Sequence, residues 1–319
     1  MSKVHISIII PTFNRSYILK KIFENLKKQV NFNLRFEVLV CDSSSVDNTR
    51  QLCNLYSNNF KYKLHYLNSK INNLSAKRNL GIKSASSNKL IFIDDDCIPE
   101  VNFLSKYFNY LKDEKKIFCG IVKYPKEWLL KSNYLKYRQS THFEKIDNKQ
   151  LKPNNIVVMN MGIFIKNEDK KNLYFDERFT GYGFEDYEFA KRMIKNNFKI
   201  YKINANIIHY EIKSNFSSYI KKMYSLSKYG VPNLKRINIK YFEDTKYHQI
   251  EKKFFIKLLK SLKFLKSIFN MIIHLLILLD KYGLLYSKLF YRLAILLSYL
   301  NGKYDRDLRI IKNKKNWYE

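Results

Sequence analysis

Short apolar segments that each run into a polar loop and then an amphipathic segment recur along the first part of the chain, and this alternation limits the fold more than any other feature. The apolar segments are residues 4–10, 36–42, 63–68 and 89–94, and the amphipathic segments are 16–29, 43–56 and 73–85. Such apolar runs predict strands, and apolar residues at helical spacing predict helices between them. The alternation predicts an α/β fold with a doubly wound, mostly parallel central sheet and a ligand site at the carboxyl ends of its strands.

The pattern loosens beyond this region. Residues 155–167 resemble a strand or a strand pair, 181–196 a loop followed by a helix, and 199–210 another strand. Residues 211–319 then contain 23 Lys and Arg against 8 Asp and Glu, whereas residues 1–210 contain 36 against 20. We therefore expect an α/β domain over residues 1–212 and a basic, helical C-terminal extension over residues 213–319.

The extension contains an amphipathic basic stripe. Its lysines are Lys253, Lys257, Lys260, Lys263 and Lys266, and they lie beside Phe254, Phe255, Leu258, Leu259, Leu262 and Leu265. The longest charge-free run there, residues 267–279, is shorter than the roughly 20 residues that a spanning helix needs. This favours a helix that lies on an anionic membrane surface, or one that packs on the α/β domain or on a second copy of the chain.

Net charge and cysteine content limit which partners and which cellular compartment the chain is expected to have. The net charge of +31 favours anionic partners such as nucleotides, nucleic acids or acidic lipids. The four cysteines form no CxxC pair and no regular framework, so they suggest neither a zinc site nor a disulfide scaffold, and a reducing cytosol is the simpler compartment. The apolar run before Pro11 is too short for a signal peptide.

Carboxylates follow two of the predicted strands directly. Asp42 ends one strand, and Asp94, Asp95 and Asp96 follow another, so all should lie at the same edge of the sheet. Adjacent carboxylates repel one another unless a cation or a set of donors compensates, and oxygen-rich sites suit Mg²⁺ or Mn²⁺. A metal that also holds a diphosphate would resolve the repulsion, whereas the alternative is that these acids only start turns or cap helices.

Four segments carry a resemblance to a known family. "ISIIIPTFNR", "VLVCDSSSVDNT", "AKRNLGIKSASSNKLIFIDDDC" and "GYGFEDYEFAKRM" together resemble family 2 glycosyltransferases of the GT-A fold, in the same order and over about residues 4–212. The resemblance implies transfer of a sugar from a nucleotide-activated donor to an acceptor hydroxyl, with inversion at the anomeric carbon. It also implies roles for single residues on the donor side: Pro11 and Thr12 in the nucleotide pocket, Asp42 on uracil, Arg78 at the nucleotide or diphosphate, Asp94 at the ribose, Asp95 nearby and Asp96 on the metal. For Arg78 the alternative is a solvated charge on a helix.

The acid pair Glu185 and Asp186 resembles the corresponding region of inverting galactosyl- and N-acetylgalactosaminyltransferases, although Phe184 stands where many of these have glycine. The resemblance implies Asp186 as the base for the acceptor hydroxyl and Glu185 as a partner for a sugar hydroxyl, with Tyr182 and Phe184 against a sugar ring. A helix start should keep both carboxylates ionised, and simple helix capping is the alternative role. The resemblance also implies that His209, at the end of a strand, completes the metal site, and the alternative is an ordinary, partly buried histidine.

The resulting hypothesis is a hexosyltransferase that uses Mn²⁺ or Mg²⁺ and a UDP-sugar, with Gal or GalNAc favoured over Glc or GlcNAc. Its acceptor would be a saccharide, either free or lipid-linked, in bacterial surface polysaccharide or lipooligosaccharide synthesis at the inner face of the membrane. Two alternatives remain, a basic nucleic-acid-binding protein and a sugar-1-phosphate nucleotidyltransferase. No nucleic-acid motif and no Gly-rich phosphate loop supports either one.

Overall fold

The computed structural model describes residues 4–29, 35–57, 62–142, 149–211, 215–253 and 262–315. The chain forms two compact units, each built from separate stretches of sequence. The first unit comprises Met1–Pro125, His142–Glu177 and Glu185–Glu211, and the second comprises Lys126–Thr141, Arg178–Phe184 and Ile212–Glu319. The functional division at residue 212 stays a prediction.

The first unit is built on one sheet. Its strands among the described residues are β1 (Ile6–Pro11), β2 (Phe36–Asp42), β3 (Lys63–Asn68), β4 (Lys89–Ile93), β5 (Cys97–Pro99), β6 (Lys116–Lys123), β7 (Asn160–Phe164) and β8 (Lys199–His209). They lie in the order β3-β2-β1-β4-β7-β6-β8-β5. Strands β1 to β4 run parallel to one another, and β6 runs parallel to β8. Strand β7 is antiparallel to β4 and β6, and β5 is antiparallel to β8. The predicted doubly wound sheet is confirmed.

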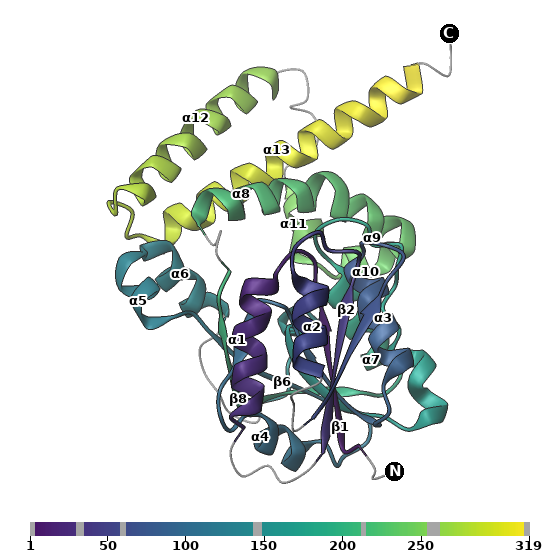
Figure 1. The fold of residues 1–319 in the computed structure, drawn as a ribbon. Coiled ribbons are helices and arrows are strands. Elements are labelled where there is room, and N and C mark those ends of the chain that lie inside the picture. The colour runs from purple at the N-terminus through teal and green to yellow at the C-terminus, as the bar shows by residue number, and fades with distance from the viewer. Residues whose placement is uncertain are drawn as a thin grey trace. The chain divides into compact units, whose positions relative to one another are not determined.

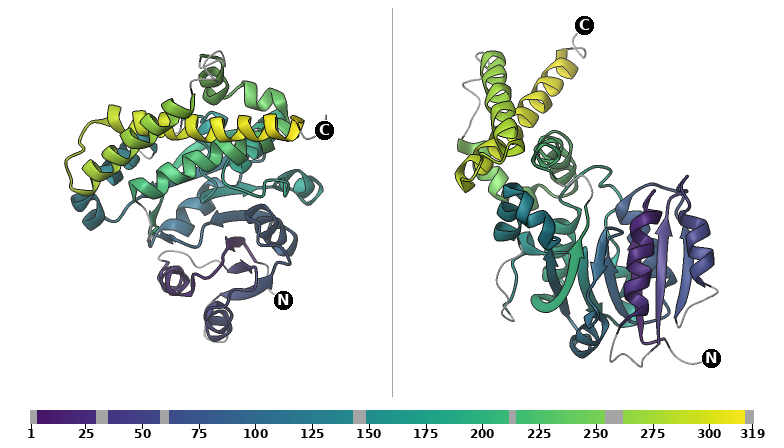
Figure 2. Two further views of the ribbon diagram at one scale, coloured as in Figure 1. Left: turned by 90° about the horizontal axis from the view of Figure 1, so that it is seen from above. Right: turned by 60° about the vertical axis from the view of Figure 1, so that its left-hand side comes forward.

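Helices cover both faces of this sheet (Figures 1 and 2). One face packs against α1 (Ser16–Lys27), α2 (Thr49–Ser57) and α4 (Phe103–Tyr110), and the other against α3 (Leu74–Ser84) and α7 (Glu185–Lys195). Neighbouring residues of β1 therefore join different cores: Ile8 lies in the first and Ile9 in the second. A Cβ at Gly81 of α3 would lie 2.4 Å from Ile9 Cγ2, so this helix approaches the sheet more closely than any side chain would allow. Short 3₁₀ turns are η1 (Pro153–Asn155) and η2 (Asn167–Leu173).

The second half of the sheet is held by one buried amide. Asn160 is fully buried; its Nδ2 donates to the carbonyls of Ile121 (3.0 Å) and Ala205 (2.9 Å), and its Oδ1 accepts from the Tyr107 hydroxyl (2.7 Å). A bulge in β6 at Gly120 makes room, since a Cβ there would lie 2.3 Å from the amide nitrogen. The sequence pattern did not predict strand β6. This amide fixes β7, β6 and β8 side by side and so fixes the strand that ends at His209.

The second unit is helical. Its helices are α5 (Lys126–Lys131), α6 (Asn133–His142), α8 (Phe216–Ser225), the π-helix η3 (Leu226–Gly230), α9 (Val231–Ile237), α10 (Ile239–Glu243), α11 (Lys246–Lys253), α12 (Leu262–Lys281) and α13 (Lys288–Lys315). Aromatic rings form its core, where Tyr291 stacks on Tyr137 (4.7 Å) and meets Phe216 edge to face (4.9 Å). A buried ion pair joins Arg306 Nη2 to Glu251 Oε1 at 2.8 Å. The predicted helical extension is confirmed.

Helices α12 and α13 cross as a hairpin (Figures 1 and 2). Residues 254–261, which hold Lys257, Lys260 and four of the apolar positions of the predicted basic stripe, lie outside the described residues. No helix within the described ranges combines the length and the apolar character needed to cross a bilayer.

Candidate active site

The strand ends bring the predicted acids together as the topology requires. Asp94, Asp95 and Asp96 form the turn between β4 and β5, and His209 is the last residue of β8. Because β5 pairs with β8, the backbone N–H of Tyr210 donates to the Asp96 carbonyl at 2.7 Å. The acid triplet and His209 thus meet at one edge of the sheet.

Each carboxylate of the triplet has its own partner in the protein. Asp94 accepts from Arg78 Nη2 (3.2 Å), Asp95 accepts from the Thr12 hydroxyl (2.9 Å), and Asp96 pairs with Arg15 Nη1 (3.1 Å). Asp96 also lies 3.2 Å from His209 Nε2. Two arginines, a histidine and a hydroxyl therefore offset part of the mutual repulsion for which a metal was predicted.

These partners give the three aspartates different pKa values. Burial raises the pKa of Asp94 against the opposing charge of Arg78. Burial and the charge of Asp96 raise the pKa of Asp95 to about 7, although Arg15 and the Thr12 hydroxyl oppose this. Burial also acts to raise the pKa of Asp96, but the hydrogen bond and charge of His209, together with Arg15, lower it to about 2. Asp96 is the member of the triplet that is held ionised.

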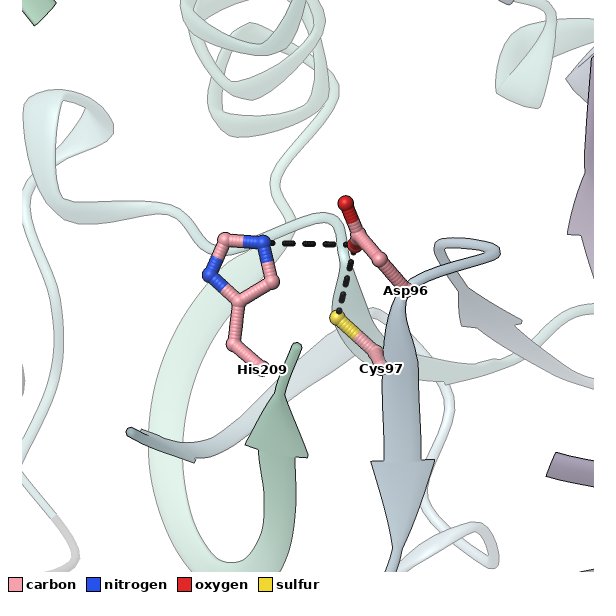
Figure 3. Close-up of side chains that lie close together, drawn as sticks. All are labelled: Asp96, Cys97 and His209. Atoms are coloured by element: carbon pink, nitrogen blue, oxygen red, sulfur yellow. Dashed lines mark hydrogen bonds and ion pairs between the residues drawn. The ribbon is translucent and has the colours of Figure 1, made fainter. Parts of the chain in front are cut away.

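Asp96, Cys97 and His209 form the one group of potential metal ligands found within the described residues (Figure 3). One ligand atom from each lies within 4.8 Å of the other two, and all three residues are buried. Burial would lower the pKa of His209, but its hydrogen bond to Asp96 raises it. A carboxylate, an imidazole and a thiol are a donor set that fits a divalent transition-metal ion.

Arg78 joins the triplet to the acid pair. Its side chain is only 1% exposed, and while Nη2 reaches Asp94, Nη1 donates to Asp186 Oδ1 at 2.8 Å. The guanidinium lies over the ring of Phe175, with 5.0 Å from Cζ to the ring centroid. Arg78 is thus not a solvated helix charge. It is a buried cation shared between two carboxylates that are far apart in the sequence.

Glu185 and Asp186 are the first residues of α7. Burial, followed by the charge of Asp186, raises the pKa of Glu185 to about 7. Its Oε2 atom is buried and has no hydrogen-bond partner within the described parts of the chain. Glu185 is therefore only partly ionised near neutral pH, because desolvation raises its pKa despite its place at a helix start.

The other predicted site residues make different contacts. Asp42 is fully buried and accepts from Ser45 N (2.9 Å), Ser45 Oγ (2.5 Å) and the Tyr66 hydroxyl (2.7 Å). Pro11 lies in register with Cys41 at the end of β1. In the second unit, Tyr182 is 43% exposed and Phe184 meets Tyr247 edge to face at 5.7 Å. The roles of these residues stay predictions.

The backbone at Phe184 has a conformation that suits the glycine found at this position in many of the similar transferases. Phe184 has φ = 75° and Gly183 has φ = 101°, so both adopt the left-handed region that glycine favours. The chain therefore keeps the glycine conformation at Phe184 without the glycine. This is the turn that leads into α7 and the acid pair.

Sequence reasoning missed three residues of the site. Arg15 follows β1 in a loop and reaches Asp96, Lys77 Nζ donates to the Thr12 carbonyl at 2.8 Å, and Cys97 lies beside His209. Lys77 adjoins Arg78 and Cys97 directly follows the triplet, so adjacency in the sequence was an available signal for both. No comparable signal marked Arg15 among 59 basic residues.

Several known proteins are similar to this chain in sequence. The family model described as glycosyl transferase family 2 matches residues 7–172. The chain is 30% identical over 233 residues to the dolichyl N-acetyl-alpha-D-glucosaminyl phosphate 3-beta-D-2,3-diacetamido-2,3-dideoxy-beta-D-glucuronosyltransferase of Methanococcus voltae, covering 69% of this chain and 71% of that protein. It is 30% identical to the chondroitin synthase of Pasteurella multocida over 60% of this chain and 23% of that protein. The chain spans less than two fifths of the length of this synthase and of other bacterial relatives.

Two solved structures share the fold. The mannosyltransferase PcManGT from Pyrobaculum calidifontis, in complex with GDP-Man and Mn²⁺, superimposes with a TM-score of 0.61 at 14% identity, covering 97% of this chain and 88% of that one. TarS 1-349 of S. aureus, in complex with UDP-GlcNAc, gives 0.50 at 14% identity over 94% and 90%. The fold is the predicted GT-A fold, and the family match covers more than half of the chain. The chain belongs to glycosyl transferase family 2.

Proposed function

We propose that this chain is a metal-dependent, inverting hexosyltransferase that moves a sugar from a UDP-sugar to a saccharide hydroxyl. The observation that carries the proposal is the connected site itself. An ionised Asp96 beside His209 is linked through Asp94 and Arg78 to Asp186 within one unit of the chain. Nucleic-acid binding and nucleotidyl transfer, the two alternatives, are disfavoured by the family assignment.

In this proposal the acid triplet binds the sugar donor. Asp94 would contact the ribose, with Asp95, Thr12 and Pro11 lining the nucleotide pocket and Asp42 near the base. Asp96 and His209 would hold Mn²⁺ or Mg²⁺, which as a Lewis acid stabilises the charge of a departing diphosphate. The complexes of TarS with UDP-GlcNAc and of PcManGT with Mn²⁺ support a nucleotide-sugar donor and a metal in this fold.

In this proposal the acid pair, Glu185 and Asp186, acts on the acceptor and its proton. The acceptor oxygen would attack the anomeric carbon, the bond from that carbon to the diphosphate oxygen would break with its electron pair, and the acceptor proton would pass to Asp186. Arg78 occupies Oδ1 of Asp186, which leaves Oδ2 for the proton. Glu185, with its buried and unpartnered Oε2, would bind a sugar hydroxyl.

The identity of the donor is tested by a screen. Purified chain is incubated with UDP-Gal, UDP-GalNAc, UDP-Glc, UDP-GlcNAc or GDP-Man, with Mn²⁺, Mg²⁺ or chelator, and release of the nucleotide is measured with and without saccharide acceptors. We expect metal-dependent release of UDP, greatest with a galacto donor. Release of GDP alone would contradict the UDP assignment.

A role for Asp96 is tested separately by UDP binding. In Asp96→Ala, metal-dependent UDP binding should be lost, because the variant lacks the ionised ligand of the proposed metal. Asp113→Ala is the control, since Asp113 is exposed and pairs only with Lys116 among the described residues. Unchanged affinity in Asp96→Ala would remove Asp96 from the metal site.

The second unit offers a surface for an anionic bilayer at the inner face of the cell membrane. Its hairpin patch, defined as Tyr282, Leu284, Tyr286, Leu289 and Phe290, exposes each of these side chains by 46 to 76%. Exposed Lys281, Lys288 and Arg292 surround it. Aromatic and leucine side chains ringed by cations match a headgroup interface better than water, and such binding would keep the enzyme near lipid-linked acceptors.

Vesicle flotation tests this surface. The full chain should float with vesicles that contain phosphatidylglycerol, and Leu284→Ser/Tyr286→Ser/Leu289→Ser should lose this binding while Leu130→Ser, an exposed leucine in α5, retains it. Equal binding by all three proteins would contradict membrane docking. A wild-type dimer that the triple variant dissociates would assign the patch to a second copy of the chain instead.

A further inference from the structure

Strand pairing places a thiol beside the proposed metal ligands. In the antiparallel ladder between β5 and β8, Cys97 is the direct partner of His209, followed by Ile98 with Ile208. Directly opposed residues point to the same face of a sheet with Cβ atoms about 4.5–5.5 Å apart. The thiol and the imidazole therefore share one face because of the register, whatever rotamers they adopt.

Both groups converge on one oxygen. Oδ1 of Asp96 lies 3.2 Å from His209 Nε2 and 3.6 Å from Cys97 Sγ, as the dashed lines in Figure 3 show. Ligand bonds of about 2.0–2.3 Å in tetrahedral geometry hold ligand atoms roughly 3.3–3.8 Å apart. These two separations are close to this range, and all three ligand atoms lie within 4.8 Å of one another.

We propose that Cys97 is a third protein ligand, so that this centre binds thiophilic divalent ions such as Zn²⁺ or Co²⁺ in preference to Mg²⁺. The inference rests on the metal role proposed for Asp96 and His209 and specifies which ion suits it. Binding moves the thiol proton to solvent as the sulfur–metal bond forms. Three protein ligands leave one tetrahedral position for a diphosphate oxygen, which is the arrangement of catalytic rather than structural zinc sites.

The other cysteines provide the control. Cys41, Cys53 and Cys119 are also free and buried, yet none of them belongs to a group of three potential ligands within the described residues. Cys53 packs among apolar side chains of the first core. Cys53→Ala therefore removes a buried thiol of equal size without touching the proposed centre.

The test uses the full chain, stripped of metal and titrated with Co²⁺ and with Zn²⁺. Thiolate ligation gives a sulfur-to-cobalt charge-transfer absorption in the near ultraviolet, and competition with a chromogenic chelator gives the zinc affinity. Wild type and Cys53→Ala should show the band. Cys97→Ala and Cys97→Ser should lack it and bind Zn²⁺ at least tenfold more weakly, while their Mn²⁺-dependent UDP binding changes less than about threefold.

The outcomes separate this inference from the proposed function. A band that persists in both Cys97 variants, or that is absent from wild type, would overturn the role of Cys97, and retained Mn²⁺-dependent UDP binding would leave the metal role of Asp96 and His209 intact. If wild type binds no Co²⁺, Zn²⁺ or Mn²⁺, the proposed metal site fails as well. Thermal unfolding without metal checks that the Cys97 variants fold.

Discussion

The two acidic groups of the site solve the same electrostatic problem in different ways. In the triplet every carboxylate has a protein partner, and Asp96 is held ionised by His209 and Arg15. In the pair, Glu185 is desolvated with one oxygen unpartnered, and its pKa is raised to about 7. Arg78 touches both groups. Asp96, which its partners keep ionised, suits holding a cation, whereas Glu185, which its surroundings keep partly protonated, suits a hydrogen bond to a hydroxyl that it can donate or accept.

Removal of the proposed base should have the largest effect. Asp186→Asn keeps an acceptor for Arg78 but cannot take the acceptor proton, so the transfer rate should fall by a factor of about 10²–10⁴. UDP-sugar affinity should persist because the triplet is untouched. Steady-state kinetics and calorimetry separate the two quantities, and Glu188→Gln on the same helix is the control. Loss of rate and binding together would indicate a structural role.

Removal of the shared cation should have the next largest effect. Arg78→Met leaves Asp94 and Asp186 without their buried partner, which should lower the free energy of unfolding by about 3–5 kcal/mol. Lys115→Met is the control, because Lys115 and its partner Asp169 are 42% and 30% exposed, and it should cost no more than about 1 kcal/mol. Urea denaturation measures both. Equal losses would mean that Arg78 does not bridge the two groups.

Neutralising Glu185 should stabilise the fold above neutral pH. Between its ordinary value of 4.5 and the folded pKa of about 7, the folded chain holds a proton that the unfolded chain has lost, so unfolding free energy falls as pH rises through this window. Glu185→Gln should therefore be more stable than wild type by about 1–3 kcal/mol at pH 8 and equal to it at pH 4. A pH series of urea denaturation measures this, and a difference that does not depend on pH would refute it.

The smallest effect should come from the exposed partner of the triplet. Arg15 is 37% exposed, so the Arg15→Gln variant should lose less than about 1 kcal/mol of stability. The same denaturation assay measures it. A loss as large as that of Arg78→Met would show that the triplet depends on Arg15 as much as on its buried partners.

The first half of the sheet was predictable because its signals are local. Apolar runs such as 36–42 are buried on both faces, and Asp47 accepts from Thr49 N at the start of α2. The second half depends on contacts that are distant in the sequence. Neither the bulge at Gly120 nor the amide of Asn160 has a local pattern, so β6 was missed.

The candidate site shows the same difference between local sequence signals and contacts that are distant in the sequence. The triplet and the acid pair could be read from strand ends and from a family resemblance. The separate roles of these acids could not be predicted in this way. They depend on which cation contacts which carboxylate in the folded chain: Arg78 contacts Asp186, and Arg15 contacts Asp96. Desolvation of Glu185 likewise depends on tertiary packing rather than on its place at a helix start.

The register that opposes Cys97 and His209 also orders events during synthesis. A ribosome delivers the acid triplet well before β8, so a nascent chain carries three adjacent carboxylates before His209 has been made. Arg15 precedes them in the chain and can provide a positive charge for Asp96. If the proposed centre binds metal, its affinity would arise only when β8 pairs with β5, and metal capture during refolding would report the moment at which the sheet is completed.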